Sequence, residues 1–346
     1  MAAYTTVDDA GSFFNTKLYT GTAAENVITG VGFSADFTWI KRRSSTGAHY
    51  AFDTVRGATK AVIINDTDVE DTNAEFLKSW ESDGFTLGTS GGPNGSYSYA
   101  SWNWKAGTTS GITAGSQTIT PSGYSINTTS GFGIYEYSGA SATSTIAHGL
   151  GAAPAMIIVK STSNATNWQV GSTAMDSTWN YVLYLNLQHS KQNEIMYGDT
   201  PPDATYFTLG NASETNGSGR DYIAYAWTPI QGYSKFGTYN GNSDADGPLI
   251  YTGFQPAFIL VKRYDSGTED WNLWNNKALG YNVDNNKIYA NLTNAEVDAD
   301  EVDLVSNGFK WRTTNGGLNA SGGSYAYMAF ASNPLVNSES IPGNAR

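Results

Sequence analysis

The stretch that decides the fold is MIIVK at residues 156–160. Long apolar and β-branched residues fill it up to a terminal lysine, a pattern typical of a buried strand with a polar exit. The pattern occurs twice more, as FTWIK at residues 37–41 and FILVK at residues 258–262. Three copies of one strand predict an internal repeat, which governs how every other motif is interpreted.

Further landmarks keep register around the three lysines, Lys41, Lys160 and Lys262. A glycine precedes each lysine by nine residues, at Gly32, Gly151 and Gly253. The other landmarks recur in the same order: aromatic-x-Gly turns at 19–21, 137–139 and 239–241, the aromatics Tyr50, Trp168 and Trp271, runs ending at Asn65, Asn186 and Asn291, and Phe85, Phe207 and Phe309. Spacing drifts only between landmarks, where hairpin loops accept insertions. The repeat therefore preserves strand, turn and core residues.

Composition agrees with a chain of short strands joined by turns. Charged residues make up 14% of the 346 residues and aromatics 13%, while Gly, Ser, Thr and Asn dominate the polar fraction. We therefore predict an all-β protein of three tandem antiparallel β-sandwich modules, of jelly-roll or concanavalin-like type. The predicted segments are an N-terminal tail (1–17), module 1 (18–106), a Gly/Ser/Thr linker or extended arm (107–131), module 2 (132–231), module 3 (232–332) and a C-terminal tail (333–346).

Several classes of partner and compartment are disfavoured. A net charge of −12 with scattered lysines and arginines gives no basic footprint for nucleic acid. The chain has no cysteine, no apolar run long enough to insert into a membrane, and an N-terminus unlike a signal peptide. These features predict a protein assembled in the cytoplasm.

Nothing in the sequence has the form of an active site. The three histidines, His49, His148 and His189, occupy unrelated repeat positions, and no nucleophile elbow, P-loop or zinc-protease motif occurs. The acidic residues gather in two loops at equivalent repeat positions, 66–71 and 296–303. A pair of carboxylates there could serve a glycosidase, but a solvated rim explains both loops more simply. We expect no enzyme.

Two sets of residues are candidates for binding. Trp102, Trp179 and Trp274 do not recur in phase, so we expect surface contacts from them, for example with sugars. Asn242, Asp244 and Asp246 match the opening half of a calcium loop, although Gly253 stands where the bidentate glutamate belongs. A polar turn competes with a structural Ca²⁺ at that loop, and we expect no other cofactor.

Several motifs resemble a family of tailed-bacteriophage proteins that occur widely in marine and cyanobacterial phages. They are DFTWIK at 36–41, VRGATK at 55–60, WNWKAG at 102–107, HGLG at 148–151 with Pro154, GYSKFG at 232–237 and NAR at 344–346. Members carry labels such as SPRY-like, concanavalin-like or tail fibre. The resemblance covers nearly the whole chain and implies a virion surface protein made of β-sandwich modules. It carries over no catalytic residue and no established ligand.

Three functional hypotheses follow from the repeat and the resemblance. The first is a non-enzymatic tail fibre or fibre-associated protein that binds a host receptor or surface glycan. Such a protein would contact other virion proteins and form a homo-oligomer, with a trimer expected by analogy. The alternatives are a capsid decoration or head-fibre protein, and a glycan-binding or glycan-degrading module. The loops and the seam after module 1 differ most between copies, so we expect specificity to lie there.

Overall fold

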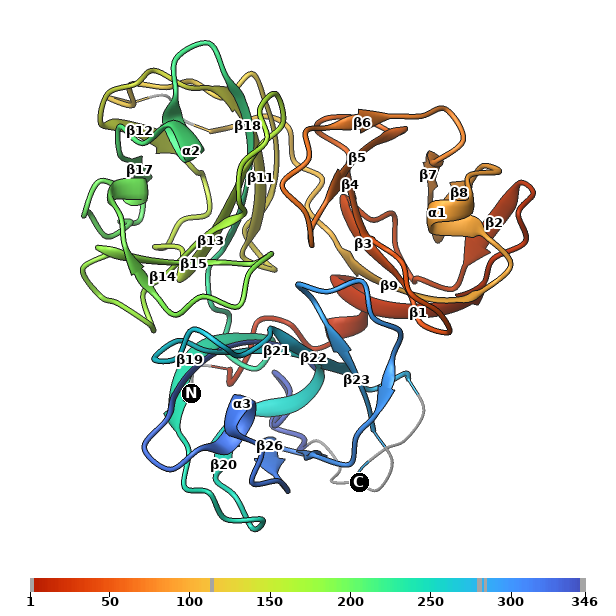
Figure 1. The fold of residues 1–346 in the computed structure, drawn as a ribbon. Coiled ribbons are helices and arrows are strands. Elements are labelled where there is room, and N and C mark those ends of the chain that lie inside the picture. The colour runs from red at the N-terminus through yellow and green to blue at the C-terminus, as the bar shows by residue number, and fades with distance from the viewer. Residues whose placement is uncertain (1–2, 113–114, 279–281, 283–284, 343–346) are drawn as a thin grey trace.

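A computed structural model describes residues 3–112, 115–278, 282 and 285–342. The chain is an all-β protein built from antiparallel sheets, as the sequence predicts. Three lobes surround a common axis, and Figure 1 looks along that axis. No helix in the described part of the chain has the length and apolarity to cross a membrane.

Each lobe contains a large inner sheet that faces the axis and a small outer sheet. In module 1 the inner sheet has the order β1-β9-β3-β4-β5-β6 and the outer sheet β2-β8-β7. The module 1 elements are η1 (Ala10–Ser12), β1 (Phe14–Thr20), β2 (Asn26–Thr29), β3 (Phe37–Arg42), β4 (His49–Asp53), β5 (Lys60–Ile63), β6 (Asp71–Thr72), β7 (Leu77–Glu81), β8 (Gly84–Leu87), α1 (Gly91–Asn94) and β9 (Ser98–Trp104).

Modules 2 and 3 repeat the strand order of the inner sheet, with one additional strand in module 2, whereas the outer sheet of module 2 has two described strands in place of three. Their inner sheets run β10-β11-β18-β13-β14-β15-β16 and β19-β27-β21-β22-β23-β24, and their outer sheets are β12-β17 and β20-β26-β25. The module 2 elements are β10 (Gly123–Asn127), β11 (Phe132–Ser138), β12 (Ser144–Ala147), β13 (Met156–Ser161), β14 (Gln169–Ser172), β15 (Tyr181–Tyr184), β16 (Gln192–Asn193), η2 (Ile195–Tyr197), β17 (Tyr206–Leu209), α2 (Ser213–Asn216) and β18 (Asp221–Trp227). The module 3 elements are β19 (Ser234–Asn240), β20 (Leu249–Tyr251), β21 (Phe254–Arg263), β22 (Asn272–Asn275), β23 (Asn286–Tyr289), β24 (Val297–Asp298), β25 (Val302–Val305), β26 (Gly308–Trp311), α3 (Gly316–Asn319) and β27 (Ser324–Pro334).

The landmark residues occupy matching positions in the three sandwiches. Phe85, Phe207 and Phe309 each lie opposite an isoleucine of the outer sheet, at Ile28, Ile146 and Ile250 respectively. The landmark glycines Gly32, Gly151 and Gly253 have φ values of 94°, 78° and 86°, a backbone region that side chains with a Cβ avoid. The sequence landmarks therefore mark core contacts and obligatory turns.

Both faces of each inner sheet are covered. One face packs on the outer sheet of its own module, and the other packs on the neighbouring modules across the axis. Continuous burial of β3, β13 and β21 follows from this double cover.

Aromatic rings from all three modules meet at the axis. Phe14 of module 1 stacks on Phe330 of module 3 with ring centroids 5.1 Å apart, and Trp104 lies 6.3 Å from Trp227 of module 2. The cavity left on the axis has a volume of only about 20 Å³. The three lobes therefore share one continuous core without a channel.

Residues 107–131 do not form a free linker. β10 lies within this segment and pairs with β11, so the segment extends the inner sheet of module 2. Ile119 and Ile126 are buried in the core of module 2, which explains why a stretch so rich in Gly, Ser and Thr is held in place.

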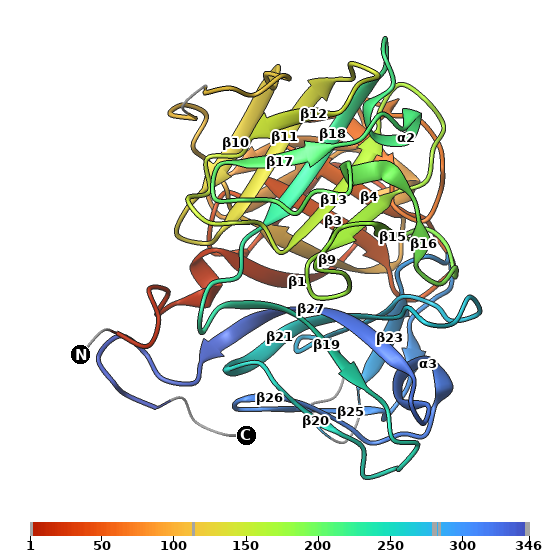
Figure 2. The same cartoon turned by 90° about the vertical axis from the view of Figure 1, so that its left-hand side faces the viewer.

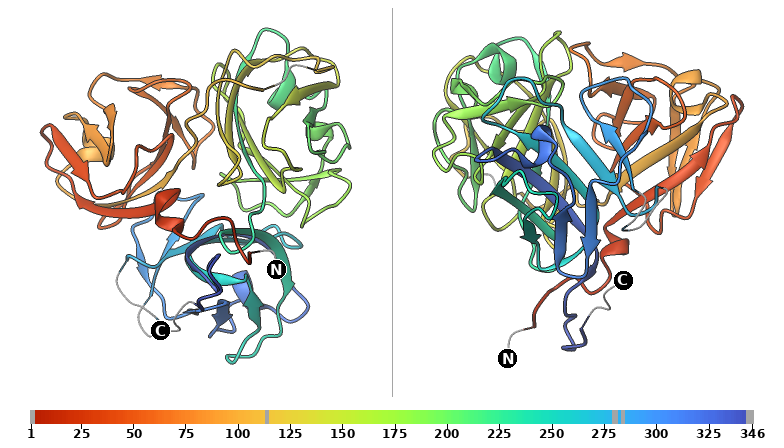
Figure 3. Two further views of the ribbon diagram at one scale, coloured as in Figure 1. Left: turned by 180° about the vertical axis from the view of Figure 1, so that it is seen from behind. Right: turned by 60° about the horizontal axis from the view of Figure 1, so that its bottom comes forward.

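The two tails are also anchored. β1 begins at Phe14, four residues earlier than the predicted module boundary, and Val7 is buried. Thr5 donates to the carbonyl of Gln231 (2.7 Å), and Asp8 accepts a hydrogen bond from Ser338 N (2.7 Å). Both termini leave the ring at the same end of its axis (Figures 2 and 3). The motif at 344–346 lies outside the described residues.

Candidate functional site

The landmark lysines form the first repeated contact between modules. Lys160 Nζ donates to the carbonyl of Thr67 in module 1 (3.0 Å), Lys262 Nζ to Gln188 in module 2 (2.8 Å), and Lys41 Nζ to Thr293 in module 3 (2.9 Å). Each acceptor lies two residues beyond a landmark asparagine. The expected polar exit is wrong: all three lysines are fully buried, because the next module surrounds the end of the strand.

A ring N–H next to each lysine makes the second contact. Trp168 Nε1 donates to Ile63 O (2.8 Å) and Trp271 Nε1 to Tyr184 O (2.8 Å). In module 1 the strand register pairs Lys41 with His49, whose Nε2 lies 3.0 Å from Tyr289 O. His49 is therefore the counterpart of Trp168 and Trp271. The landmark position assigned to Tyr50 from the sequence was wrong by one residue.

Backbone hydrogen bonds make the third contact. Three N–H groups at equivalent positions each donate to a carbonyl of the adjacent module: Glu70 to Thr162 (2.9 Å), Lys191 to Tyr264 (2.9 Å) and Glu296 to Arg43 (2.8 Å). Module 1 thus contacts module 2, module 2 contacts module 3, and module 3 contacts module 1 through the same surfaces. This is a head-to-tail interface whose rotation closes, here within one chain.

Burial changes the proton affinity of the junction lysines. It lowers the pKa of Lys41 to about 7 and the pKa values of Lys160 and Lys262 to about 8. Backbone carbonyls are the hydrogen-bond acceptors of all three ammonium groups, and none of them forms a salt bridge within the described residues. Burying a charged lysine in each junction costs free energy, and this cost falls as the pH rises because the lysine loses its proton.

The junction between modules 1 and 2 carries an additional buried ion pair. Arg56 Nε lies 2.6 Å from Asp53 Oδ2, and both side chains are fully buried. Tyr225 of module 2 donates to the same carboxylate oxygen (2.8 Å), and Glu70 pairs with Arg56 Nη1 (3.2 Å). Burial next to Asp53 raises the pKa of Tyr225 well above its usual value, so the tyrosine remains a donor.

The other two modules have neutral residues at these positions. The strand register places Ser172 and Met175, then Asn275 and Ala278, where module 1 has Asp53 and Arg56. In module 3 the turn is kept, because Asn275 Oδ1 accepts from Ala278 N (2.8 Å), as Asp53 Oδ1 does from Arg56 N (2.8 Å). The ion pair is therefore not required by the repeat.

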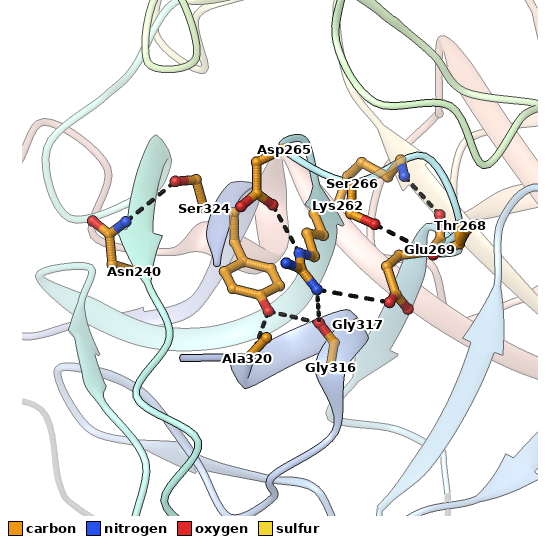
Figure 4. Close-up of polar contacts among 12 residues, drawn as sticks. Asn240, Lys262, Asp265, Ser266, Thr268, Glu269, Gly316, Gly317, Ala320 and Ser324 are labelled. Carbon is orange, nitrogen blue, oxygen red and sulfur yellow. Dashed lines mark hydrogen bonds and ion pairs between the residues drawn. The ribbon is translucent and has the colours of Figure 1, made fainter. Parts of the chain in front are cut away.

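The end of each module opposite the chain termini holds a second repeated cluster. A buried asparagine ends each short helix, at Asn94, Asn216 and Asn319, and donates to two loop carbonyls. An arginine donates to the first carbonyl of each helix: Arg42 to Gly91 (2.7 Å), Arg220 to Ser213 (3.1 Å) and Arg263 to Gly316 (3.2 Å). Figure 4 shows the arginine contacts in module 3, where the carboxylates of Asp265 and Glu269 flank the Arg263 guanidinium that donates to Gly316. Each of these asparagines is the first residue of an Asn-x-Ser sequence, and all three side chains are buried within a turn.

The tryptophans expected at the surface are all buried. Trp102 lies in the axial core against Phe258 (6.1 Å), Trp179 packs edge-on against Tyr197 (5.0 Å), and Trp274 packs against Trp311 (5.3 Å). The expectation of surface contacts is wrong for these three. Trp102 and Trp274 lie in inner sheets that are covered on both faces, and Trp179 lies in a loop whose side chains pack into the core of module 2. An exposed aromatic that the repeat pattern did not single out is Tyr97, beneath the guanidinium of Arg42 at 4.0 Å.

The candidate calcium loop is held by internal bonds. Asn242 Oδ1 accepts from Asp244 N (2.9 Å), and Asp244 Oδ1 accepts from Asp246 N (2.9 Å). The carboxylate of Asp246 pairs with Arg312 (2.7 Å) and Lys310 (3.1 Å), which lowers its pKa. Because two positively charged side chains already lie beside this carboxylate, binding of a calcium ion there is disfavoured. No group of three or more metal-binding side chains occurs among the described residues. The geometry fits the polar turn better than the calcium site.

The groups most suited to acid–base chemistry have internal partners. His49 Nδ1 accepts from Trp39 Nε1 (3.0 Å), and His148 Nδ1 accepts from Leu150 N (3.1 Å). Burial lowers both histidine pKa values, so both rings are neutral at pH 7. Of four cavities lined by described residues, one contains a carboxylate, Asp36, and none of the four is lined by the acidic loops at 66–71 and 296–303.

The fold and its junctions define a class of protein: a single-chain ring of three β-sandwich modules joined by one repeated set of contacts. The chain belongs to the family of the domain of unknown function DUF7483, whose model matches residues 9–334. This span begins just before β1 and ends with β27, so the family domain is the complete ring. No curated protein matches the chain.

Proposed function

We propose that this chain is a non-enzymatic bacteriophage virion protein, a tail fibre or fibre-associated protein that binds a host receptor. The observation that carries the proposal is the closed ring. Nine equivalent hydrogen bonds, three at each junction, lock three sandwiches into one body and leave the loops between strands as the variable surface. A rigid body with variable loops suits recognition, because little entropy is lost when it binds.

The partner and localisation hypotheses belong to this proposal. They are contacts with other virion proteins, exposure at the virion surface after synthesis in the host cytoplasm, and a homo-oligomer. The ring completes its own threefold arrangement, so its junctions need no second copy. Sedimentation of the purified chain distinguishes a 37.0 kDa monomer from a trimer.

Location in the virion is the decisive test. A phage carrying an epitope-tagged copy is labelled with gold-conjugated antibody and imaged by electron microscopy. We expect label on the tail. Label confined to the head overturns the fibre proposal in favour of a capsid decoration protein, and the absence of the tag from purified virions overturns both.

A glycan-binding role is favoured by one specific feature, the exposed Tyr97 ring capped by Arg42. A solvent-facing aromatic beside a hydrogen-bonding cation is suited to holding a sugar ring. Glycan-array binding that disappears in Tyr97→Ala and persists in Tyr251→Ala, a second exposed tyrosine, supports this role. Binding that is unchanged in Tyr97→Ala contradicts it.

A further inference from the structure

The inner sheet of module 2 contains one strand that the other modules lack. β10 pairs antiparallel with β11 and covers its outer edge. The inner sheets of modules 1 and 3 end instead at β1 and β19, and no strand formed by the described residues lies beyond them. The same sheet edge is therefore covered by β10 in module 2 and left uncovered by the described residues in modules 1 and 3.

The open backbone groups of β1 can be identified. Lys105 N donates to Phe13 O and Gly21 N to Tyr97 O, so the odd-numbered residues between them bond to β9. Thr16 and Leu18 direct their N–H and C=O groups to the opposite side, where no backbone partner from the described residues reaches them. Their module 2 counterparts are Ile134 and Glu136, which face Ser125 and Gly123 of β10.

A groove of about 300 Å³ runs beside this edge. Residues 15–18 and Gly30 line it from module 1, and Lys277 lines it from module 3. The counterpart of Lys277 in the next junction is Val55, which lies beside Gly123 of β10. The groove is therefore the place that β10 occupies in module 2.

We propose that the β1 edge is a docking groove in which an extended acidic segment of a partner polypeptide adds as an antiparallel strand. Main-chain hydrogen bonds to Thr16 and Leu18 supply the affinity, as in other strand-addition complexes. Lys17 and Lys277 supply the charge preference: two cations line this groove in a chain of net charge −12. By analogy with β10, the segment contributes five residues and spans roughly 17 Å.

The inference concerns the chemistry of a partner and does not depend on where in a virion the chain resides. Its test uses the full chain and a defined probe, the acetylated and amidated peptide Glu-Glu-Gly-Tyr-Ser-Ile-Asn-Glu-Glu, which carries the β10 sequence between acidic flanks. Binding is measured by fluorescence anisotropy at low salt, and the site is located by hydrogen exchange. Two control peptides carry lysine flanks or N-methyl groups on the Gly and Ser amides.

Leu18→Pro removes one open-edge N–H while leaving the bonds to β9 in place, since proline is accepted on edge strands. Thr238→Pro is the matched control, because Thr238 occupies the position of Leu18 on β19 and lies outside the groove that residues 15–18 line. Lys17→Ala combined with Lys277→Ala tests the charge preference. Circular dichroism establishes that each variant is folded.

We expect Leu18→Pro to weaken binding at least about tenfold and Thr238→Pro to change it less than about twofold. The double lysine variant should weaken binding about fivefold and flatten its dependence on salt. Bound peptide should slow exchange at Thr16 and Leu18 at least about tenfold. Three results overturn the proposal: the peptide does not bind, protection from exchange appears elsewhere in the chain, or the N-methylated peptide binds equally well. If the peptide does not bind, the role of Lys17 is to prevent other strands from pairing with this edge.

Discussion

Replacing Arg56 by methionine tests the most unusual feature of the ring, the buried ion pair at the junction of modules 1 and 2. The change removes the bonds from Arg56 to Asp53, Glu70 and Ala51 O. It leaves the carboxylate of Asp53 in a fully buried site with Tyr225 and two backbone N–H groups as donors.

The magnitude follows from the burial of both partners. Removing one member of a fully buried pair typically costs about 3–5 kcal/mol, because the remaining charge has no compensation. Three donors remain on Asp53, so we expect about 3 kcal/mol for Arg56→Met. The double variant Asp53→Asn with Arg56→Met should cost less than about 1 kcal/mol, because neutral replacements of buried pairs are often nearly neutral. Asn275 of module 3 and Met175 of module 2 already occupy these positions.

The assay is urea unfolding at pH 7 followed by tryptophan fluorescence, with Lys78→Met as the control. Lys78 forms an exposed pair with Glu25, and its loss should leave the urea midpoint close to that of the unsubstituted chain. The reasoning is refuted if Arg56→Met costs less than about 1 kcal/mol, or if the double variant is as unstable as the single one.

Three further predictions concern the repeated contacts. Trp271→Phe leaves the carbonyl of Tyr184 without its indole donor and should lower the unfolding free energy by about 1–3 kcal/mol. Trp80→Phe removes an indole N–H that has no partner among the described residues, and it should cost less in the same urea experiment. The pKa of Lys160 is about 8 in the folded chain and about 10.4 in the unfolded chain. Between these two pH values the unfolded chain binds more protons than the folded chain, so the unfolding free energy should rise with pH from about 8 to 10. Lys160→Met should flatten that rise in urea midpoints, and an identical slope would contradict the role of this lysine. Gly139→Ala places a Cβ 2.4 Å from Gly217 O and should cost about 1–3 kcal/mol in thermal unfolding, while Gly91→Ala, whose Cβ meets no atom within 4 Å, should not.

The candidate site was harder to predict than the fold. The aromatics Trp102, Trp179 and Trp274 gave no sequence signal of their burial, because the partners that cover them come from another module or from other strands and helices of the same module. Tyr97 gave no signal of its exposure, since aromatic content alone does not distinguish core from rim. The calcium pattern at 242–246 was visible, but the cations that pair with Asp246 lie more than 60 residues away.

The sequence by itself determined the all-β class, the strands around Lys41, Lys160 and Lys262, and the turns at Gly32, Gly151 and Gly253. These features depend on local periodicity and on backbone preferences, which neighbouring residues carry. Only the tertiary structure decided that those lysines are buried, that residues 107–131 add a strand, and that the modules close into a ring. The physical reason is separation: Lys41 and its acceptor Thr293 are 252 residues apart, so nothing local to either residue specifies their contact.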